Sequence, residues 1–157
     1  CQIENQMIYL ASDHAGFDLK KEIIAFLTMS KLDYEDIGAF VYDEKDDYPD
    51  FIIPAAEKVA VDPENNLGIV IGGSGQGEAI AANKVRNIRA ALYYGGPIDI
   101  VTLSRVHNHA NVLSLGARFV SKEEAIKVIT IWLNTSYVNR DRHSRRIEKI
   151  QRYERRD

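Results

Sequence analysis

Short apolar runs alternate along the chain with longer segments whose apolar residues recur at helical spacing. Five runs have the length and composition of buried strands, at residues 7–12, 34–37, 67–71, 89–93 and 112–115. The segment after the first run repeats its apolar residues at i, i+4, i+7 and i+8, as in Leu19, Ile23, Phe26 and Leu27. Because alternating strands and helices form βαβ units, the sequence predicts an α/β fold with a parallel sheet covered on both faces.

Several helices carry start signals in the sequence. Asp50 is a candidate N-cap for a helix with Ile53, Ala56 and Ala60 on its buried face. Pro97 follows two glycines and suits the first position of another helix. Ser121 and the glutamate three residues later, Glu124, have the spacing of a capping box, and an apolar stripe follows at 125, 128, 129, 132 and 133.

The final helix, expected from about residue 144 to 155, differs from the others. Its apolar positions, such as Ile147 and Ile150, form a thin stripe among many arginines. Such a stripe buries little on its own domain, so we expect this C-terminal segment, about 143–156, to pack on a partner subunit. Residues 7–157 are predicted to form one domain, and residues 1–6 are expected to be a leader or an expression remnant, with Met7 near the native start.

Composition excludes several classes of protein. The 157 residues are 45% hydrophobic and 27% charged with a net charge of -3, as in an ordinary globular domain. The single cysteine, Cys1, allows no disulfide within the chain and no cysteine metal site. No apolar run approaches the roughly 18 residues that span a bilayer, and we expect a cytoplasmic protein.

A glycine-rich segment, GGSGQGE at residues 72–78, stands between the third predicted strand and a helix expected from about Glu78. A glycine turn that opens a helix offers backbone N–H groups and the positive end of the helix dipole to an anion. Neither the dinucleotide fingerprint nor the P-loop spacing is present, and an ordinary tight turn is the alternative. The hydroxyl of Ser74 and the carboxylate of Glu78 favour a functional loop, with Glu78 as a candidate general base.

Other polar groups follow the ends of predicted strands, where parallel α/β sheets bind their ligands. Asp13 and His14 follow the first strand, although a helix N-cap would explain Asp13 equally well. Two glycines, Gly95 and Gly96, follow the fourth strand. A metal site at His107 and His109 is not expected because no third ligand of suitable type is nearby; a His–Asn pair beside a sugar site fits better.

A basic cluster surrounds the start of the final helix. From residue 140 to the end, the sequence has eight basic residues and four acidic ones. Arg142 and Arg146 are four residues apart, which places both guanidinium groups on one helix face, where they could clamp a phosphate. A solvated basic face is the equally weighted alternative.

Taken together, these segments resemble the ribose-5-phosphate isomerase B and galactose-6-phosphate isomerase family. The matching segments cover nearly the whole chain from Met7: SDHAGFDLK (12–20), DYPDF (47–51), GGSGQGEAIAANK (72–84), LSRVHN (103–108), NVLSLGARF (111–119) and RHSRR (142–146). The resemblance implies a Rossmann-like three-layer α/β/α sandwich that forms a homodimer, with active sites shared between subunits and with no metal or organic cofactor. Pairing of dimers into tetramers stays open.

The resemblance also implies roles for individual residues. Asp13 and His107 match residues that open the furanose ring, and Asn108 matches a sugar-contacting position. Ser74 and the backbone N–H groups of Gly75 and Gly77 match an anion hole, and neighbouring Gly73 is also expected to bind substrate. The phosphate ligands are matched by His14, Arg118, Arg142 and Arg146, some of them offered by the neighbouring subunit.

The family divides over the base that moves the proton. One branch has a cysteine at the position of Gly72, whereas the other has a glutamate at the position of Glu78, and this chain resembles the second. The chain departs from the common pattern at His109, where the family often has Asp; this departure puts the surroundings of His107 in doubt.

The sequence therefore predicts an aldose–ketose isomerase that interconverts ribose 5-phosphate and ribulose 5-phosphate through a cis-enediolate. The same chemistry on a six-carbon sugar phosphate, such as galactose 6-phosphate, is the nearest alternative. A non-catalytic sugar-phosphate-binding protein is a second alternative, which Glu78, His107 and Asp13 together disfavour. Nucleic-acid or membrane binding by the basic tail is not expected, because the body is acidic and aromatic residues are not interleaved with the basic ones.

Overall fold

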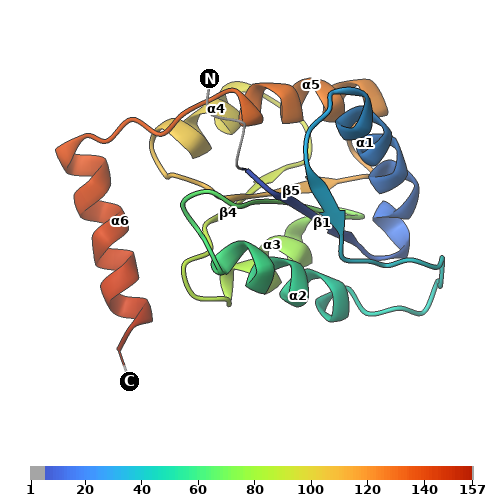
Figure 1. The fold of residues 1–157 in the computed structure, drawn as a ribbon, viewed down its shortest axis with the longest axis horizontal. Coiled ribbons are helices and arrows are strands. Elements are labelled where there is room, and N and C mark those ends of the chain that lie inside the picture. Colours follow the sequence, from blue (N-terminus) through green and yellow to red (C-terminus); the bar gives the residue numbers. More distant parts are fainter. Residues whose placement is uncertain (1–5, 157) are drawn as a thin grey trace.

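The computed structural model describes residues 6–156, so the leader expected at 1–6 lies almost wholly outside the described residues. The chain folds into alternating strands and helices (Figure 1). The strands are β1 (Ile8–Ser12), β2 (Tyr34–Asp36), β3 (Leu67–Gly72), β4 (Ala90–Tyr93) and β5 (Val112–Gly116). The helices are the short 3-10 helix η1 (His14–Gly16), then α1 (Phe17–Met29), α2 (Pro49–Ala60), α3 (Gln76–Asn83), α4 (Asp99–Val106), α5 (Lys122–Leu133) and α6 (Asp141–Glu154).

All five strands pair in parallel in the order β2-β1-β3-β5-β4, which confirms the predicted sheet. The three inner strands are wholly or almost wholly buried because helices cover both faces. Figure 1 shows α1, α4 and α5 on one side of the sheet and α2 and α3 on the other, which gives the three-layer sandwich.

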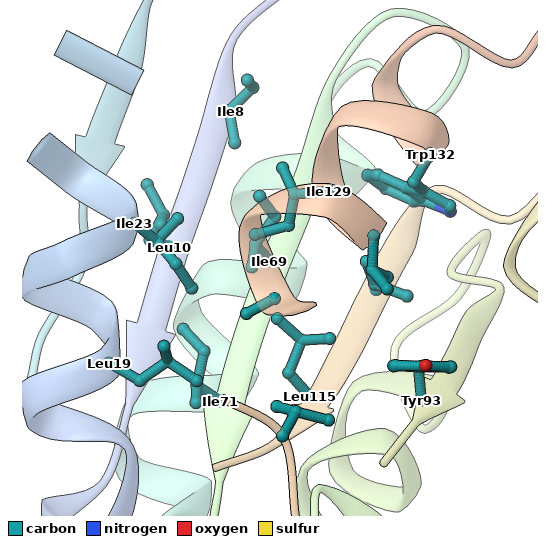
Figure 2. Close-up of a cluster of buried hydrophobic side chains, with 14 of the residues drawn as sticks. Ile8, Leu10, Leu19, Ile23, Ile69, Ile71, Tyr93, Leu115, Ile129 and Trp132 are labelled. Carbon is teal, nitrogen blue, oxygen red and sulfur yellow. The ribbon is translucent and has the colours of Figure 1, made fainter. Parts of the chain in front are cut away.

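The larger core lies between the sheet and the layer of α1, α4 and α5. Figure 2 shows Leu19 and Ile23 from α1 and Ile129 and Trp132 from α5 against strand residues such as Ile69. Each of these side chains is buried, and a fully buried aliphatic side chain contributes about 1.5–3 kcal/mol. This packing holds the strands rigidly, so the loops at their carboxyl ends have fixed positions.

Two predicted helix starts are wrong. Asp50 does not cap α2; the helix begins at Pro49, and Asp50 lies in its first turn. The buried face of α2 consists of Ile52, Ala55, Ala56 and Val59 rather than Ile53, Ala56 and Ala60. Both stripes are apolar at helical spacing, so only contact with the sheet decides between them. Pro97 precedes α4 by two residues and is not its first residue.

The capping box at α5 is half formed. The Ser121 hydroxyl accepts a hydrogen bond from the Glu124 N–H at 3.1 Å, as predicted. The Glu124 carboxylate instead accepts a hydrogen bond from the Tyr93 hydroxyl at 2.6 Å. Burial and this carboxylate raise the pKa of Tyr93 to about 12. Helix α5 is thereby joined to the end of β4.

Helix α6 follows a linker without regular structure and lies beyond the sandwich (Figure 1). It begins three residues earlier than expected, and only His143 and Ile147 are buried among its 14 residues. This scarcity agrees with the thin apolar stripe in the sequence. No helix in the described part of the chain is long and apolar enough to cross a membrane.

Candidate active site

The carboxyl ends of the three inner strands bring most of the candidate residues together. Ser12 of β1 is in register with Ile71 of β3, and Gly72 of β3 with Gly116 of β5. Asp13 and His14 follow β1, the glycine loop follows β3, and Arg118 follows β5. The segment that begins at Gly95 lies at the same edge but follows the outer strand β4, with β5 between it and the glycine loop.

The glycine loop is held in shape by its neighbours. Gly75 adopts a left-handed backbone (φ +79°) at the N-cap of α3, which a residue with a side chain rarely adopts. The buried Ser114 hydroxyl donates a hydrogen bond to the Gly75 carbonyl at 2.6 Å. A Cβ at Gly77 would lie 2.5 Å from the Tyr48 ring, so a larger residue at this position would require the tyrosine side chain to move.

The carboxyl group of Glu78 lies directly against Gly72. A Cβ built at Gly72 would overlap the two carboxyl oxygens and the carboxyl carbon of Glu78. The side chain therefore reaches back from the first turn of α3 over the end of β3, and the residue is only 4% exposed. The glutamate occupies the space into which a side chain at position 72 would project, so a cysteine at 72 and this placement of Glu78 exclude each other.

The environment of Glu78 disfavours its charged form. Burial is the main cause that raises the pKa of Glu78 above its usual value of 4.5, and the negative charge of Asp13 adds to it. A hydrogen bond from its own backbone N–H acts in the opposite direction. A raised pKa brings a carboxylate closer to the value at which it both accepts and returns protons near neutral pH.

Asp13 serves both as a helix cap and as a neighbour of Glu78. Its carboxylate accepts hydrogen bonds from the N–H groups of Ala15 at 2.9 Å and Gly16 at 3.3 Å, so it caps η1. The capping interpretation of the sequence is thus correct, and it does not exclude a catalytic role. The cap holds the carboxylate in one position beside the candidate base.

His14 has a carboxylate partner that sequence analysis missed. The ring Nδ1–H of His14 donates to Asp46 Oδ1 at 2.7 Å, and the backbone N–H of His14 donates to the same oxygen at 3.2 Å. This hydrogen bond is the largest cause of a raised His14 pKa, against burial and the positive charge of Arg118. Asp46 lies within an acidic run at 43–50, and nothing in that run distinguishes it from its neighbours.

Arg118 completes this cluster. Its backbone N–H donates to the Gly73 carbonyl at 3.0 Å, and its guanidinium carbon lies 3.0 Å from where a Cβ at Gly73 would stand. Arg118 therefore adjoins the glycine loop, and His14, whose pKa is raised by Asp46, is close enough to Arg118 for the two groups to interact electrostatically. Such a pair suits a dianionic phosphate.

The remaining candidates lie at the opposite edge of the sheet. His107 is the C-cap of α4. The segment that follows it leads into the start of β5, where the Asn111 N–H donates to the Arg89 carbonyl just before β4. His107 and Asn108 therefore lie at the amino edge, whereas Glu78 lies at the carboxyl edge.

At this amino edge, α6 and the end of α4 enclose a hollow of about 170 Å³, lined by His107, Asn108, His143, Arg146, Ile147 and Ile150. The His107 and His143 rings stack with centroids 4.3 Å apart. Arg142 and Arg146 are both exposed. The structure thus brings His107, Asn108 and Arg146 together, but in one chain it does not bring them to the glycine loop.

One group of three side chains in residues 6–156 has the spacing of a metal site. Ligand atoms of Asp13, His14 and Asp46 lie within 4.8 Å of one another. In the structure, the Nδ1 of His14 is engaged by Asp46 Oδ1 at 2.7 Å.

The site can be compared with those of known proteins. The family model described as Ribose/Galactose Isomerase matches residues 8–150. The chain is 46% identical over 148 residues to ribose-5-phosphate isomerase B of Mycolicibacterium paratuberculosis, which covers 94% of this chain and 91% of the relative. It is 43% identical over 147 residues to a probable ribose-5-phosphate isomerase B of Mycoplasma genitalium, covering 94% and 95%.

A crystal structure of ribose-5-phosphate isomerase B from Mycoplasma genitalium with bound ribulose-5-phosphate superimposes with a TM-score of 0.93 at 41% identity, covering 98% of this chain and 99% of that one. A Clostridium thermocellum ribose-5-phosphate isomerase B gives 0.87 at 40% identity, covering 94% and 97%. The family match includes the candidate residues at both edges of the sheet, and the chain belongs to the ribose/galactose isomerase family.

Proposed function

We propose that this chain is a ribose-5-phosphate isomerase of type B, which interconverts ribose 5-phosphate and ribulose 5-phosphate with Glu78 as its base. The observation that carries the choice of base is the buried carboxyl group of Glu78, which lies against Gly72 at the head of an anion-binding loop. The substrate is supported by relatives of that name at 43–46% identity. It is also supported by the related structure that holds ribulose-5-phosphate.

The proposed reaction moves one proton between neighbouring carbons. The carboxylate of Glu78 removes the proton from C2 of the open-chain aldose, and the electron pair of that C–H bond forms the C1=C2 double bond while negative charge moves to O1. The proton then returns from Glu78 to C1, the O2 proton moves to O1, and C2=O forms. Atoms and charge balance without a cofactor.

The glycine loop suits the negative charge that develops on O1. Ser74 and the backbone N–H groups at Gly75 and Gly77 stand at the N-terminus of α3, where the helix dipole is positive. Donors that are aimed at developing charge lower the barrier, and losing one such donor costs about 3 kcal/mol. Asp13 and His107 are proposed to open the furanose ring before the proton transfer.

The candidate residues fall into two groups at opposite edges of the sheet, and this separation supports a site shared between two subunits. His107, Asn108, Arg142 and Arg146 lie at the amino edge or on α6, whereas Glu78 lies at the carboxyl edge. A homodimer in which α6 of one subunit reaches the carboxyl edge of the other would unite both halves. The two arginines would then join His14 and Arg118 around the phosphate. The cytoplasmic location and any tetramer stay predictions.

The test is an isomerisation assay of the purified chain on ribose 5-phosphate, with Glu78→Gln beside the parent. The parent should convert the pentose phosphate, and Glu78→Gln should lose about 100-fold to 10,000-fold in kcat while keeping its KM. Near-full turnover by Glu78→Gln would exclude this base. A parent that converts only a six-carbon sugar phosphate, such as galactose 6-phosphate, would replace the pentose by the family's other substrate class.

A further inference from the structure

The direction of α6 depends on few contacts. Only two of its 14 residues are buried, and the other contacts with the sandwich include the His107–His143 stack and a hydrogen bond from the Asn87 N–H to Glu154 at 3.3 Å. The linker before it, residues 135–140, has no regular structure. Two hydrogen bonds tie this linker to α4, from the Val138 N–H to the Val106 carbonyl at 3.3 Å and from Arg105 Nε to the Thr135 carbonyl at 3.0 Å. Contacts made by side chains of the linker therefore have a large influence on where α6 points.

His109 provides a rigid surface beside this linker. Its ring stacks on the Tyr137 ring with centroids 4.3 Å apart and planes within 4° of parallel. The backbone of His109 is left-handed (φ +51°), and its carbonyl accepts a hydrogen bond from Arg89 Nε at 2.7 Å. On the outer side, Glu64 Oε2 lies 3.6 Å from His109 Nε2. The imidazole is thus fixed to the sandwich through its backbone.

Tyr137 connects this surface to α6. While its ring lies on His109, its hydroxyl shares a hydrogen bond with the Ser144 hydroxyl at 2.9 Å. Ser144 also donates to the side-chain carbonyl of Asn139 in the linker. Ser144 stands between Arg142 and Arg146 in the sequence, so the contact acts on the turn that carries both arginines.

We propose that the His109–Tyr137 stack positions α6, so that Arg142 and Arg146 meet the substrate phosphate. Both residues are positioning residues, because neither belongs to the group that would touch the sugar. The inference rests on the proposed function, since it concerns how that site acquires its phosphate ligands. It also gives a role to His109, the position at which this chain departs from the common family pattern.

A positioning role and a merely structural role predict different kinetics. If the stack orients the arginines, its loss weakens phosphate binding and leaves the proton transfer at Glu78 intact. The KM for ribose 5-phosphate then rises while kcat is kept. If the stack only stabilises the fold, its loss lowers the melting temperature and the active fraction, and KM stays the same.

Three variants separate these cases. Tyr137→Leu removes both the ring and the hydroxyl, whereas Tyr137→Phe keeps the ring and removes only the hydroxyl. His109→Asn removes the imidazole but tolerates the left-handed backbone. Each is assayed for kcat and KM on ribose 5-phosphate, for competitive inhibition by inorganic phosphate, and for melting temperature.

We expect Tyr137→Leu and His109→Asn to raise the KM and the inhibition constant of phosphate by about threefold to tenfold, the range that an aromatic pair supports. Their kcat should stay within about twofold of the parent, and Tyr137→Phe, which keeps the stack but loses the hydrogen bond to Ser144, should raise the KM by a smaller factor. An unchanged KM and phosphate inhibition constant in both ring-deleting variants would overturn the proposal, as would a fall in kcat and melting temperature without a change in KM.

Failure of the proposed function has a different signature. If the parent converts no ribose 5-phosphate, the activity assigned above is wrong, and calorimetric titration with inorganic phosphate still compares the parent with Tyr137→Leu and His109→Asn. Weaker phosphate binding in both variants would then support the positioning role. Equal binding would refute it independently of the reaction.

Discussion

A methyl group added at Gly72 would occupy the space that the Glu78 carboxyl group fills. The three atoms nearest to a Cβ at this position all belong to that carboxyl group. Since the end of a glutamate side chain can rotate away, Gly72→Ala should displace the base without distorting the strand. Alanine adopts strand geometry readily, so the free energy of unfolding should change by no more than about 1 kcal/mol.

The loss of activity should be large because proton transfer depends on position. The nearest carboxyl oxygen would lie 1.9 Å from the new methyl group, so the carboxyl group must retreat by more than about 1 Å. A misplacement of about 1 Å already costs about 100-fold in rate, equivalent to about 2.7 kcal/mol of barrier. The assay is kcat on ribose 5-phosphate for the parent, Gly72→Ala, Glu78→Gln and the double variant. If Gly72 acts only through Glu78, the double variant should be no slower than Glu78→Gln alone.

A matched control adds the same methyl group elsewhere on β3. A Cβ at Gly68 would meet side-chain atoms of Val112 and Val59 at 3.1 Å, away from Glu78. Gly68→Ala should therefore lower thermal stability and keep kcat. The reasoning is refuted if Gly72→Ala keeps near-parent kcat, or if its loss multiplies with that of Glu78→Gln in the double variant.

Three other perturbations test two charged groups of the site and the buried ammonium of Lys20. Because burial raises the pKa of Glu78 above 4.5, kcat/KM should fall on the acid side with a midpoint above that value, and Glu78→Gln should be more stable than the parent at pH 8 but not at pH 4. Asp46→Asn removes the partner that raises the pKa of His14, so the ratio of its KM to that of the parent should be larger at pH 7 than at pH 5.5. The buried Lys20 ammonium donates to Asp36 at 2.8 Å and to the Ala39 carbonyl at 2.7 Å, so Lys20→Met should lose about 1–3 kcal/mol in urea unfolding.

Each of these outcomes has a clear opposite. An acid limb centred at or below pH 4.5 would mean that Glu78 is not the titrating base. If the KM ratio for Asp46→Asn does not vary with pH, Asp46 does not act on substrate binding through the pKa of His14. Unchanged urea stability of Lys20→Met would show that Asp36 and Ala39 find other partners, or water, in the variant.

Local patterns determined most of the fold. Five apolar runs separated by helical stripes predicted five parallel strands, and every strand is present within one residue of its expected ends. This succeeds because the side-chain periods of strands and helices are properties of neighbouring residues. Local pattern does not decide the buried face of α2, where two adjacent apolar stripes are present, or the partner of Glu124, whose carboxylate accepts a hydrogen bond from Tyr93 rather than from its own helix end.

The glycine loop and its chemistry were also legible in the sequence, because they lie within seven consecutive residues. The order of Ser74, Glu78 and Asp13 along the chain, together with the resemblance to known isomerases, identifies them as candidates. The contact between the Glu78 carboxyl group and Gly72 was not, since it depends on how α3 turns back over β3.

The tertiary structure alone decided which distant residues meet. Asp46 pairs with His14 across 32 positions of sequence, and His107 is separated from Glu78 by the length of the sheet rather than placed beside it. Both results follow from the strand order β2-β1-β3-β5-β4 and from the direction in which each helix returns. No local pattern encodes such pairings, because they depend on the order in which strands distant in sequence join the sheet.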